Sequence, residues 1–473
     1  MVRRLLPVTA ALAGSAALLA CATPGIESPP PLDWEVIEAE AASRLSEYLR
    51  IDTTNPPGNE VSAVPFLRGL FEDTAIEVEE FASAPGRASL VARLRGSGAG
   101  GAILLMHHID VVAADARYWE RDPFGGEIVD GQIWGRGALD TKGLGITHAL
   151  AMRTLAEQRV PLNRDIVLLA VADEEAGGAA GAGYMVESHF DAFRGAAFML
   201  NEGGAIQADA DGRALAYAVE AAQKVPLWLR LRVRGTPGHG SMPRPDAAPT
   251  RLVRALSRIA AYETPLRVLP RVQRFHADMA HLAPPDQRSI WADLAAALED
   301  PDLEARFTSD VRQNAMIRNT ISITRFAASP KTNVIPPEAT AELDVRLLPD
   351  QDPDAFVATL REVVADPAVE IERLLSFPPA ASPVDHPFFD ALRRLAARYD
   401  PEAIVTPTMA VGFTDCHFFR ERGIPCYGFA PFRITPQDRD GIHGNNERLS
   451  VEELGRGTKM TYELLRELAT DAP

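Results

Sequence analysis

Clusters of basic residues are absent from this chain. Its 48 Lys and Arg residues form no basic block and are outnumbered by 65 Asp and Glu residues, which gives a formal net charge of −17. Proteins that hold nucleic acid or anionic lipid through charge carry a basic patch or a run of Lys and Arg. The composition therefore argues against a nucleic-acid partner, and it says little about the substrate.

Cysteine is also scarce. The chain has three cysteines, of which Cys416 and Cys426 stand ten positions apart across a predicted helix-to-strand step. An oxidising compartment would permit a disulfide between them, but a pair in this setting is more often free and buried. We therefore expect both thiols to be free.

The chain lacks the motifs of two common classes of protein, those that bind nucleotides through a phosphate-binding loop and the serine hydrolases. The glycine-rich segments 96–102 and 177–183 have neither the position nor the spacing of a phosphate-binding loop. Ser241 lies in the run GHGSMP, which lacks the spacing of a nucleophile elbow. These absences disfavour a nucleotide-binding protein and a serine hydrolase.

The N-terminus carries an export signal. Residues 1–4 supply two positive charges, and the apolar stretch 5–20 is too short for a comfortable membrane span of ~20 residues. The closing letters LLAC are similar to a bacterial lipoprotein cleavage box, although an ordinary cut after Ala22 also fits. We expect an exported, periplasmic protein that touches the membrane only through a lipid on Cys21.

The length of 473 residues predicts more than one domain, because single cores rarely grow beyond ~250–300 residues. Helix and strand patterns alternate up to about residue 224, which indicates a wound α/β fold. From residue 225 the order becomes βαββαβ, a small ferredoxin-like domain, interrupted by a poorly patterned stretch over 263–314. The expected organisation is a signal peptide (1–20), a tether (21–32), a catalytic domain in two parts (33–224 and 377–473) and an inserted lid and dimerisation domain (225–376).

Three apolar runs lead directly into acidic or imidazole residues. The runs 102–106, 166–172 and 196–200 have the length and composition of buried strands, and they are followed by His108, Glu175 and Glu202 respectively. In an open α/β sheet the carboxyl ends of the strands line the ligand-binding crevice. With Asp140 and His443, these residues form a set of five candidate metal ligands and predict a two-metal hydrolytic site.

The neighbours of these ligands suggest separate roles. Asp110 shares a strand face with His108 and can orient its imidazole, while the two oxygens of Asp140 can bridge two cations. Of the adjacent pair Glu174 and Glu175, one would bind metal and the other would act as general base. For any single acidic residue, capping a helix or solvating a loop is the better explanation. Several clusters together make that explanation weak.

Seven motifs occur in order over nearly the whole mature chain, and together they resemble one family. They are HIDVV (108–112), WGRGALDTKG (134–143), DEE (173–175), NEGG (201–204), GHGSMP (238–243), NVIPP (333–337) and HGNNE (443–447). The ordered set resembles the co-catalytic zinc metallopeptidases that include aminoacylase, acetylornithine deacetylase, succinyl-diaminopimelate desuccinylase and glutamate carboxypeptidase. It is most similar to the carboxypeptidase S and N-acyl-amino-acid hydrolase branch. The resemblance implies a zinc-peptidase-like mixed sheet flanked by helices, with the inserted lid.

The resemblance also implies a role for each site residue. One metal would bind His108, Asp140 and Glu202, and the second Asp140, Glu175 and His443. Glu174 matches the general base, Asp110 the partner of the ligating His108, and His239 a lid histidine that serves the neighbouring subunit's site in dimeric relatives. A cis peptide is implied at Asp140–Thr141. The matching substrate contacts are Asn333, Arg346, Gly412 and Thr414.

These inferences predict a hydrolase with two Zn²⁺ per subunit, with Co²⁺ or Mn²⁺ also admissible. A water bridging the metals and activated by Glu174 would cleave the amide of an N-acyl amino acid or release the C-terminal residue of a small peptide. The alternative is a non-catalytic metal- or peptide-binding lipoprotein of the same fold. A homodimer through the inserted domain is expected from the family, although the stretch 263–314 departs from its simplest members.

Overall fold

The computed structural model describes residues 31–98 and 100–470. From Asp33 onward the chain forms one compact unit. The predicted signal peptide and the expected lipid site at Cys21 lie outside the described residues. Within the described ranges, no helix is both long enough and apolar enough to cross a membrane.

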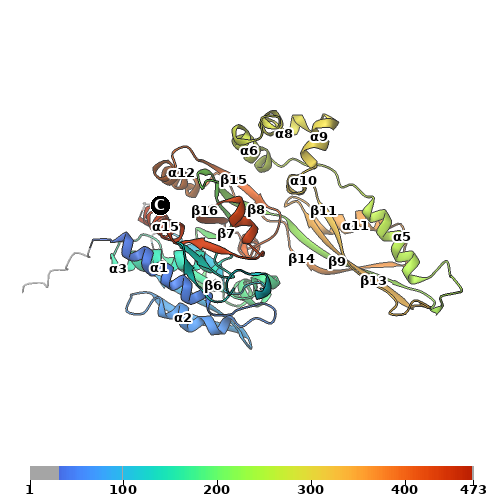
Figure 1. Ribbon diagram of the computed structural model, residues 1–473, viewed down its shortest axis with the longest axis horizontal. Helices are drawn as coiled ribbons and strands as arrows, with labels where there is room; N and C mark the ends of the chain where they lie inside the picture. The colour runs from blue at the N-terminus through green and yellow to red at the C-terminus, as the bar shows by residue number, and fades with distance from the viewer. Residues whose placement is uncertain (1–30, 99, 471–473) are drawn as a thin grey trace, which may run out of the picture. The chain divides into compact units, whose positions relative to one another are not determined.

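An eight-stranded mixed sheet forms the centre of the catalytic part (Figure 1). Strands β3, β6 and β7 pair in parallel, with His108 opposite Val171 and Leu105 opposite Leu200. Their carboxyl ends therefore meet at one edge of the sheet, as predicted. The strand order is β1 (Glu77–Ala84), β2 (Arg87–Leu94), β6 (Ile166–Val171), β3 (Ile103–His108), β7 (Phe198–Ala208), β16 (Cys426–Ile434), β8 (Ala214–Gln223) and β15 (Ile404–Ala410).

Helices cover both faces of this sheet. On one face, Leu104 and Met106 of β3 pack in a core with the short helices α4 (Tyr184–Ser188) and α13 (Cys416–Arg420). The next residue, His107, points to the other face, where a Cβ on Gly145 would lie 2.5 Å from its ring. That face carries α1 (Trp34–Leu49), α3 (Lys142–Glu157), α12 (Pro387–Tyr399) and α15 (Val451–Thr470).

Small elements bring distant loops together. The strands β4 (Ile128–Val129), β5 (Gln132–Trp134) and β17 (Arg448–Ser450) form a three-stranded sheet. The pairing of Arg448 with Trp134 joins the segment after His443 to the segment before Asp140. The helix α14 (Pro436–Gly441) contacts β17, and α2 (Val64–Gly69) contacts β2.

The inserted domain has the predicted βαββαβ order around an antiparallel sheet, β11-β13-β9-β14. Its apolar core joins β9 and β13 to both of its helices, through side chains such as Leu229, Leu252 and Leu360. The Asp352 side chain accepts a hydrogen bond from Asp354 N and so caps the N-terminus of α11. The elements are β9 (Val225–Arg234), β10 (Gly238–His239), α5 (Ala248–Ala260), β11 (Thr320–Ala327), β12 (Val334–Ile335), β13 (Glu338–Leu347), α11 (Pro353–Val364) and β14 (Val369–Ser376).

The poorly patterned stretch folds into five short helices that pack on the main sheet. Phe275, Leu294 and Met316 lie in one apolar cluster with Ala218 of β8 and Met409 of β15. In sequence this stretch lies within the inserted lid domain, and it was expected to lengthen the lid. In the structure it packs on the catalytic sheet and covers it. The helices are α6 (Pro270–Met279), α7 (Arg288–Ala292), α8 (Leu294–Ala297), α9 (Pro301–Thr308) and α10 (Val311–Ile317).

The expectation of free cysteines is wrong. Cys416 and Cys426 form a disulfide, with their Cα atoms 5.5 Å apart. Both are fully buried, as expected, but α13 begins beside the first residue of β16, so the two sulfurs face each other.

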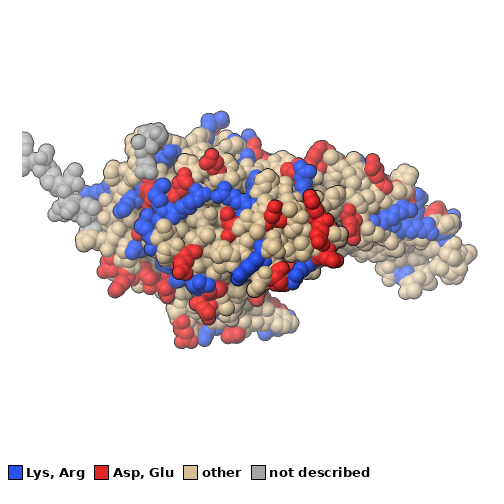
Figure 2. All heavy atoms as spheres, turned by 90° about the horizontal axis from the view of Figure 1, so that it is seen from above, with Lys and Arg blue, Asp and Glu red and all other residues tan. Residues whose placement is uncertain are grey.

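On the face displayed in Figure 2, a band of Lys and Arg crosses the catalytic part with Asp and Glu beside it, and residues of both signs occur over the rest of the face.

Candidate metal centre

The five predicted ligands converge at the carboxyl edge of β3, β6 and β7. His108 ends β3, Glu175 follows β6 directly, and Glu202 lies on β7. Asp140 precedes α3 at a cis peptide bond to Thr141, as the resemblance implied. His443 comes from the loop before β17, where its backbone has a φ of 55°.

The distances divide the five side chains into two sets that share Asp140. His108 Nε2 lies 3.0 Å from Asp140 Oδ1 and 3.8 Å from Glu202 Oε2. His443 Nε2 lies 3.1 Å from Asp140 Oδ2 and 3.2 Å from Glu175 Oε2. The two oxygens of Asp140 therefore face opposite ways, each towards its own histidine.

Crowded carboxylates perturb the titration of this cluster. Burial and the charges of neighbouring acids raise the pKa of Glu202 to about 7. Burial opposes a charge on His108, yet Glu202 and Asp140 raise its pKa well above the ordinary value. Hydrogen bonds to Asp140 and Glu175 raise the pKa of His443 to about 10. The carboxylates thus create a strongly negative site that attracts positive charge.

The donor set fits divalent cations. Ligand atoms of His108, Asp140 and Glu175 lie within 4.8 Å of one another, as do those of His108, Glu174 and Glu202. Glu175 Oε1 is buried and has no hydrogen-bond partner among the residues that the structure describes. A buried oxygen without a partner is costly unless something binds it. Imidazole nitrogens and carboxylate oxygens are ligands that zinc accepts.

Asp110 acts on the site differently from our expectation. The atom that meets His108 Nδ1 is the Asp110 carbonyl oxygen, at 2.8 Å, while the carboxylate Oδ1 lies 3.7 Å away. Strand β3 ends at His108, so the strand alternation that we assumed does not extend to Asp110. An Nδ1–H donated to this carbonyl leaves Nε2 free to face Asp140.

The Asp110 carboxylate instead holds the acidic turn that follows β6. It accepts hydrogen bonds from Glu174 N and Glu175 N, both at 3.1 Å, and from Asn55 Nδ2 at 2.8 Å. Glu174 is half-buried beside His108 and Glu202, and desolvation and the charge of Glu202 raise its pKa well above the ordinary value. Asp110 thereby fixes the backbone of a metal-ligand candidate and of the candidate base together.

Glu447 is a residue whose role the sequence did not reveal. It is fully buried, and its Oε1 accepts from Leu139 N at 2.8 Å and from Asp140 N at 3.0 Å. Its Oε2 accepts from Arg136 Nη1 at 2.7 Å, and the same guanidinium donates to Gly444 O. This buried pair ties the Asp140 loop to the His443 loop. A buried acid within the HGNNE motif was the available signal.

Asp415 is a second residue without an assigned role. Burial and the nearby charge of Asp110 raise its pKa well above the ordinary value, and its Oδ2 is buried without a hydrogen-bond partner. It follows the loop that holds Gly412 and Thr414, which the sequence had already singled out.

The lid residues do not all reach the metal ligands. His239 is exposed, and its Nδ1 lies 2.7 Å from Ser241 Oγ. Asn333 lies beside it, because its carbonyl accepts from Gly240 N at 2.8 Å. In the part of the chain that the structure describes, neither contacts any of the five ligands.

Arg346 lies near the predicted substrate loop. Its guanidinium is 5.0 Å from the ring centroid of Phe413 and donates to Asp344, while Nη1 is buried without a partner. Thr414 in the same loop is fixed by Gln223, which accepts from Thr414 N and donates to Thr414 O. Gly412 has open space on its Cβ side.

Comparison with known proteins identifies relatives along most of the chain. The N-fatty-acyl-amino acid synthase/hydrolase PM20D1 of Homo sapiens is 31% identical over 379 residues, covering 78% of this chain and 74% of that protein. Aminoacylase-1 of Homo sapiens is 28% identical over 442 residues, covering 92% of this chain and 96% of that protein.

Solved structures share the fold. The M20 family metallo-carboxypeptidase Sso-CP2 of Sulfolobus solfataricus gives a TM-score of 0.69 at 20% identity, covering 90% of this chain and 98% of that one. The YXEP protein of Bacillus subtilis, described as a dinuclear metal binding peptidase, gives 0.58 at 15% identity, covering 92% and 99%. A model of peptidase family M20/M25/M40 matches residues 104–467. The chain therefore belongs to peptidase family M20/M25/M40.

Proposed function

We propose that this protein is an exported di-metal hydrolase that cleaves the amide bond of N-acyl amino acids or releases the C-terminal residue of small peptides. Its family makes it a metal-dependent amidohydrolase, and its relatives include a fatty-acyl-amino acid hydrolase and aminoacylase-1. The observation that carries the proposal is Glu174, a half-buried carboxylate beside the five candidate ligands. A protein that only bound metal or peptide would not need this carboxylate.

Two cations are proposed to occupy the two sets of ligands. His108, Asp140 and Glu202 would hold one, and Asp140, Glu175 and His443 the other, with zinc as the leading candidate and cobalt or manganese admissible. Bound there, the pair would supply Lewis-acid polarisation of the amide carbonyl and a lower pKa for the attacking water.

Glu174 is the proposed proton carrier. Its carboxylate takes one proton from the water whose oxygen adds to the amide carbon. When the carbon–nitrogen bond breaks, the same proton passes to the departing amine. Asp110 holds Glu174 and Glu175 in fixed positions, because its carboxylate accepts hydrogen bonds from their backbone N–H groups.

The lid residues are proposed to bind the substrate. His239 and Asn333 are remote from the ligands of their own chain, so we propose that they act on a partner subunit in a homodimer formed through the inserted domain. Arg346, Gly412 and Thr414 are proposed to contact the substrate on their own subunit, since Arg346 lies over Phe413.

Hydrolysis assays with metal add-back test the proposal. The mature protein is stripped with a chelator, reloaded with zinc, cobalt or manganese, and offered acyl-glycines, acyl-aromatic amino acids and dipeptides. We expect chelator-sensitive release of an amino acid from at least one class, with two metal ions bound per chain. Two bound metals without hydrolysis of any of these compounds would instead favour the non-catalytic binding protein.

A further inference from the structure

A cavity opens directly beside two of the metal-ligand candidates. It has a volume of about 290 Å³ and is bordered by Asp140 and Glu202. Much of its wall is apolar and includes Leu144, Met409 and Phe432. Ligand pockets for small molecules begin at about 300 Å³, so this space suits one part of a substrate.

Two arginines, Arg312 and Arg439, also line this cavity. Neither side chain forms a hydrogen bond, ion pair or ring contact with any residue that the structure describes. Both residues are exposed on the side away from the cavity wall that they help to form. Desolvation and the nearby charge of Arg312 lower the pKa of Arg439, while Asp440 partly offsets this, so the two guanidinium groups lie near each other. In a chain with a net charge of −17, two neighbouring arginines with no ion-paired carboxylate among the described residues are unusual.

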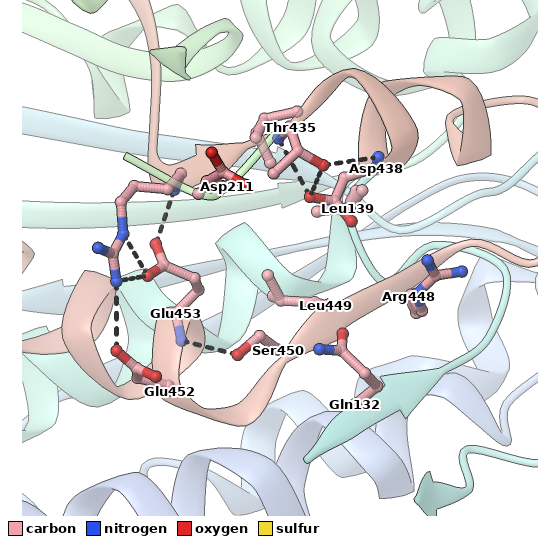
Figure 3. A pocket seen from close by; sticks show the side chains of 13 residues that line it. Gln132, Leu139, Asp211, Thr435, Asp438, Arg448, Leu449, Ser450, Glu452 and Glu453 are labelled. Carbon is pink, nitrogen blue, oxygen red and sulfur yellow. Dashed lines mark hydrogen bonds and ion pairs between the residues drawn. The ribbon is translucent and has the colours of Figure 1, made fainter. Parts of the chain in front are cut away.

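The larger cavity shown in Figure 3 offers a contrast. It has a volume of about 390 Å³ and shares Leu139 and Ile434 with the first one. Its two arginines already have partners, since Arg433 pairs with Glu453 and Glu452, and Arg448 donates to Asn446 O and lies over the ring of Trp134. Figure 3 shows Arg448, Glu452 and Glu453 around this cavity. Both arginines here are thus engaged, whereas those of the cavity beside Asp140 have no such partner among the described residues.

Separate elements bring the arginines to this place. Arg312 lies on α10, which is anchored through Met316 and Ile317 in the apolar cluster that includes Met409. Arg439 lies on α14, whose first turn is fixed by a capping box between Thr435 and Asp438. Arg312 thus comes from the helices that cover the catalytic sheet, and Arg439 comes from the segment before His443.

We propose that Arg312 and Arg439 bind a carboxylate of the substrate at this cavity while the apolar wall takes the adjoining carbon chain. Guanidinium groups bind carboxylates through paired, charge-assisted hydrogen bonds. The inference rests on the proposed function, because the scissile amide must lie at the neighbouring metal ligands. The carboxylate is either the α-carboxylate of the amino acid or a terminal carboxylate of a dicarboxylic acyl group.

Paired substrates test this inference. The metal-loaded enzyme is assayed with N-acyl amino acids, with their α-carboxamides, and with acyl groups that end in a carboxylate or a methyl group. In Arg312→Gln and Arg439→Gln, kcat/KM for the substrate with the recognised carboxylate should fall roughly 10- to 100-fold through KM, as expected for the loss of a charge-assisted hydrogen bond. The uncharged analogue should keep its wild-type rate. Arg254→Gln, an exposed arginine of α5, is the matched control.

The substrate arms identify which carboxylate is bound. If the variants lose the preference for the α-carboxylate over the α-carboxamide, the cavity binds the amino acid. If they lose the preference for an acyl group that ends in a carboxylate, the cavity binds the acyl group. The inference is wrong if both variants keep the wild-type preference for the α-carboxylate over the α-carboxamide and for the acyl carboxylate over the acyl methyl group. If the wild type hydrolyses no amide, the proposed function fails separately. Calorimetric binding of the same carboxylates to wild type and variants then still decides whether the arginines bind them.

Discussion

At the residue scale, Asp140 is the side chain on which the site depends, and other residues determine where it lies. Its two oxygens meet His108 and His443 at 3.0 and 3.1 Å, and its backbone N–H is held by Glu447. Metal affinity in such sites depends on the groups that orient the ligands as well as on the ligands themselves.

Glu447→Gln should weaken both metal retention and stability. The change leaves Arg136 buried without a charged partner, and breaking a buried pair typically costs about 3–5 kcal/mol. Loss of an orienting partner typically reduces metal affinity about 10- to 100-fold. Thermal unfolding of the stripped protein and competition with a chelator measure the two effects. Glu77→Gln, in an exposed pair with Arg95, is the control, and equal behaviour of the two variants would refute the role of Glu447.

Lys224 predicts a pH dependence of stability. It is fully buried, donates to Arg318 O at 2.9 Å, and burial lowers its pKa to about 7. Since the unfolded lysine titrates near pH 10.4, the unfolded chain binds more protons between about pH 7 and 10.4. This group therefore makes the protein more stable as the pH rises through that window, by at most about 1.4 kcal/mol per pH unit.

Denaturant unfolding at several pH values checks this expectation. The free energy of unfolding of the wild type should rise relative to that of Lys224→Met between pH 7 and about 10. Parallel curves for the two proteins would show that Lys224 is already charged in the folded state.

The ligands could be predicted from the sequence, whereas several of their supports could not. His108, Glu175 and Glu202 stand at the ends of apolar runs, which is a local signal. Glu447 and Arg136 are 311 positions apart, and Arg312 and Arg439 line one cavity only because of tertiary packing. No spacing along the chain reveals such pairs.

At the element scale, the disulfide between α13 and β16 secures the segment that follows the substrate loop. Cys416 begins α13 directly after Asp415, and Cys426 begins β16 at a separation of 10 residues. Closing a loop of that length is expected to stabilise a fold by about 2–3 kcal/mol.

The double variant Cys416→Ser/Cys426→Ser should lose roughly that much stability, about 2–3 kcal/mol. Unfolding in denaturant measures the loss, and thiol titration of the unfolded, non-reduced wild type should find no free thiol at these two positions. Two titratable thiols in freshly purified protein would show that the bond does not form.

Elements with their own end signals were predictable. Asp352 caps α11 directly before a proline at the first helical position, a signal that lies in the local sequence. The stretch 263–314 was not predictable, because its apolar side chains are divided among five short helices. The apolar side chains of these helices form one cluster only where the helices pack on β8 and β15.

At the scale of the whole molecule, the proposed lipid on Cys21 would place this enzyme at a membrane surface. When the full-length chain is expressed in a bacterium, we expect it in the detergent-extracted membrane fraction. Cys21→Ser should move it to the soluble periplasmic fraction, while Ala22→Ser should leave it at the membrane. Recovery of the wild type in the soluble fraction would instead support an ordinary signal peptide.

The central claim is that five side chains hold metal while Glu174, which holds none, moves the proton. The most direct test measures metal content and hydrolysis together in Glu174→Gln, with the exposed Glu187→Gln as control. The account predicts two metal ions per chain in both variants and a fall in kcat of about 10²- to 10⁴-fold in Glu174→Gln alone. Near wild-type kcat in Glu174→Gln with both metals bound would contradict it.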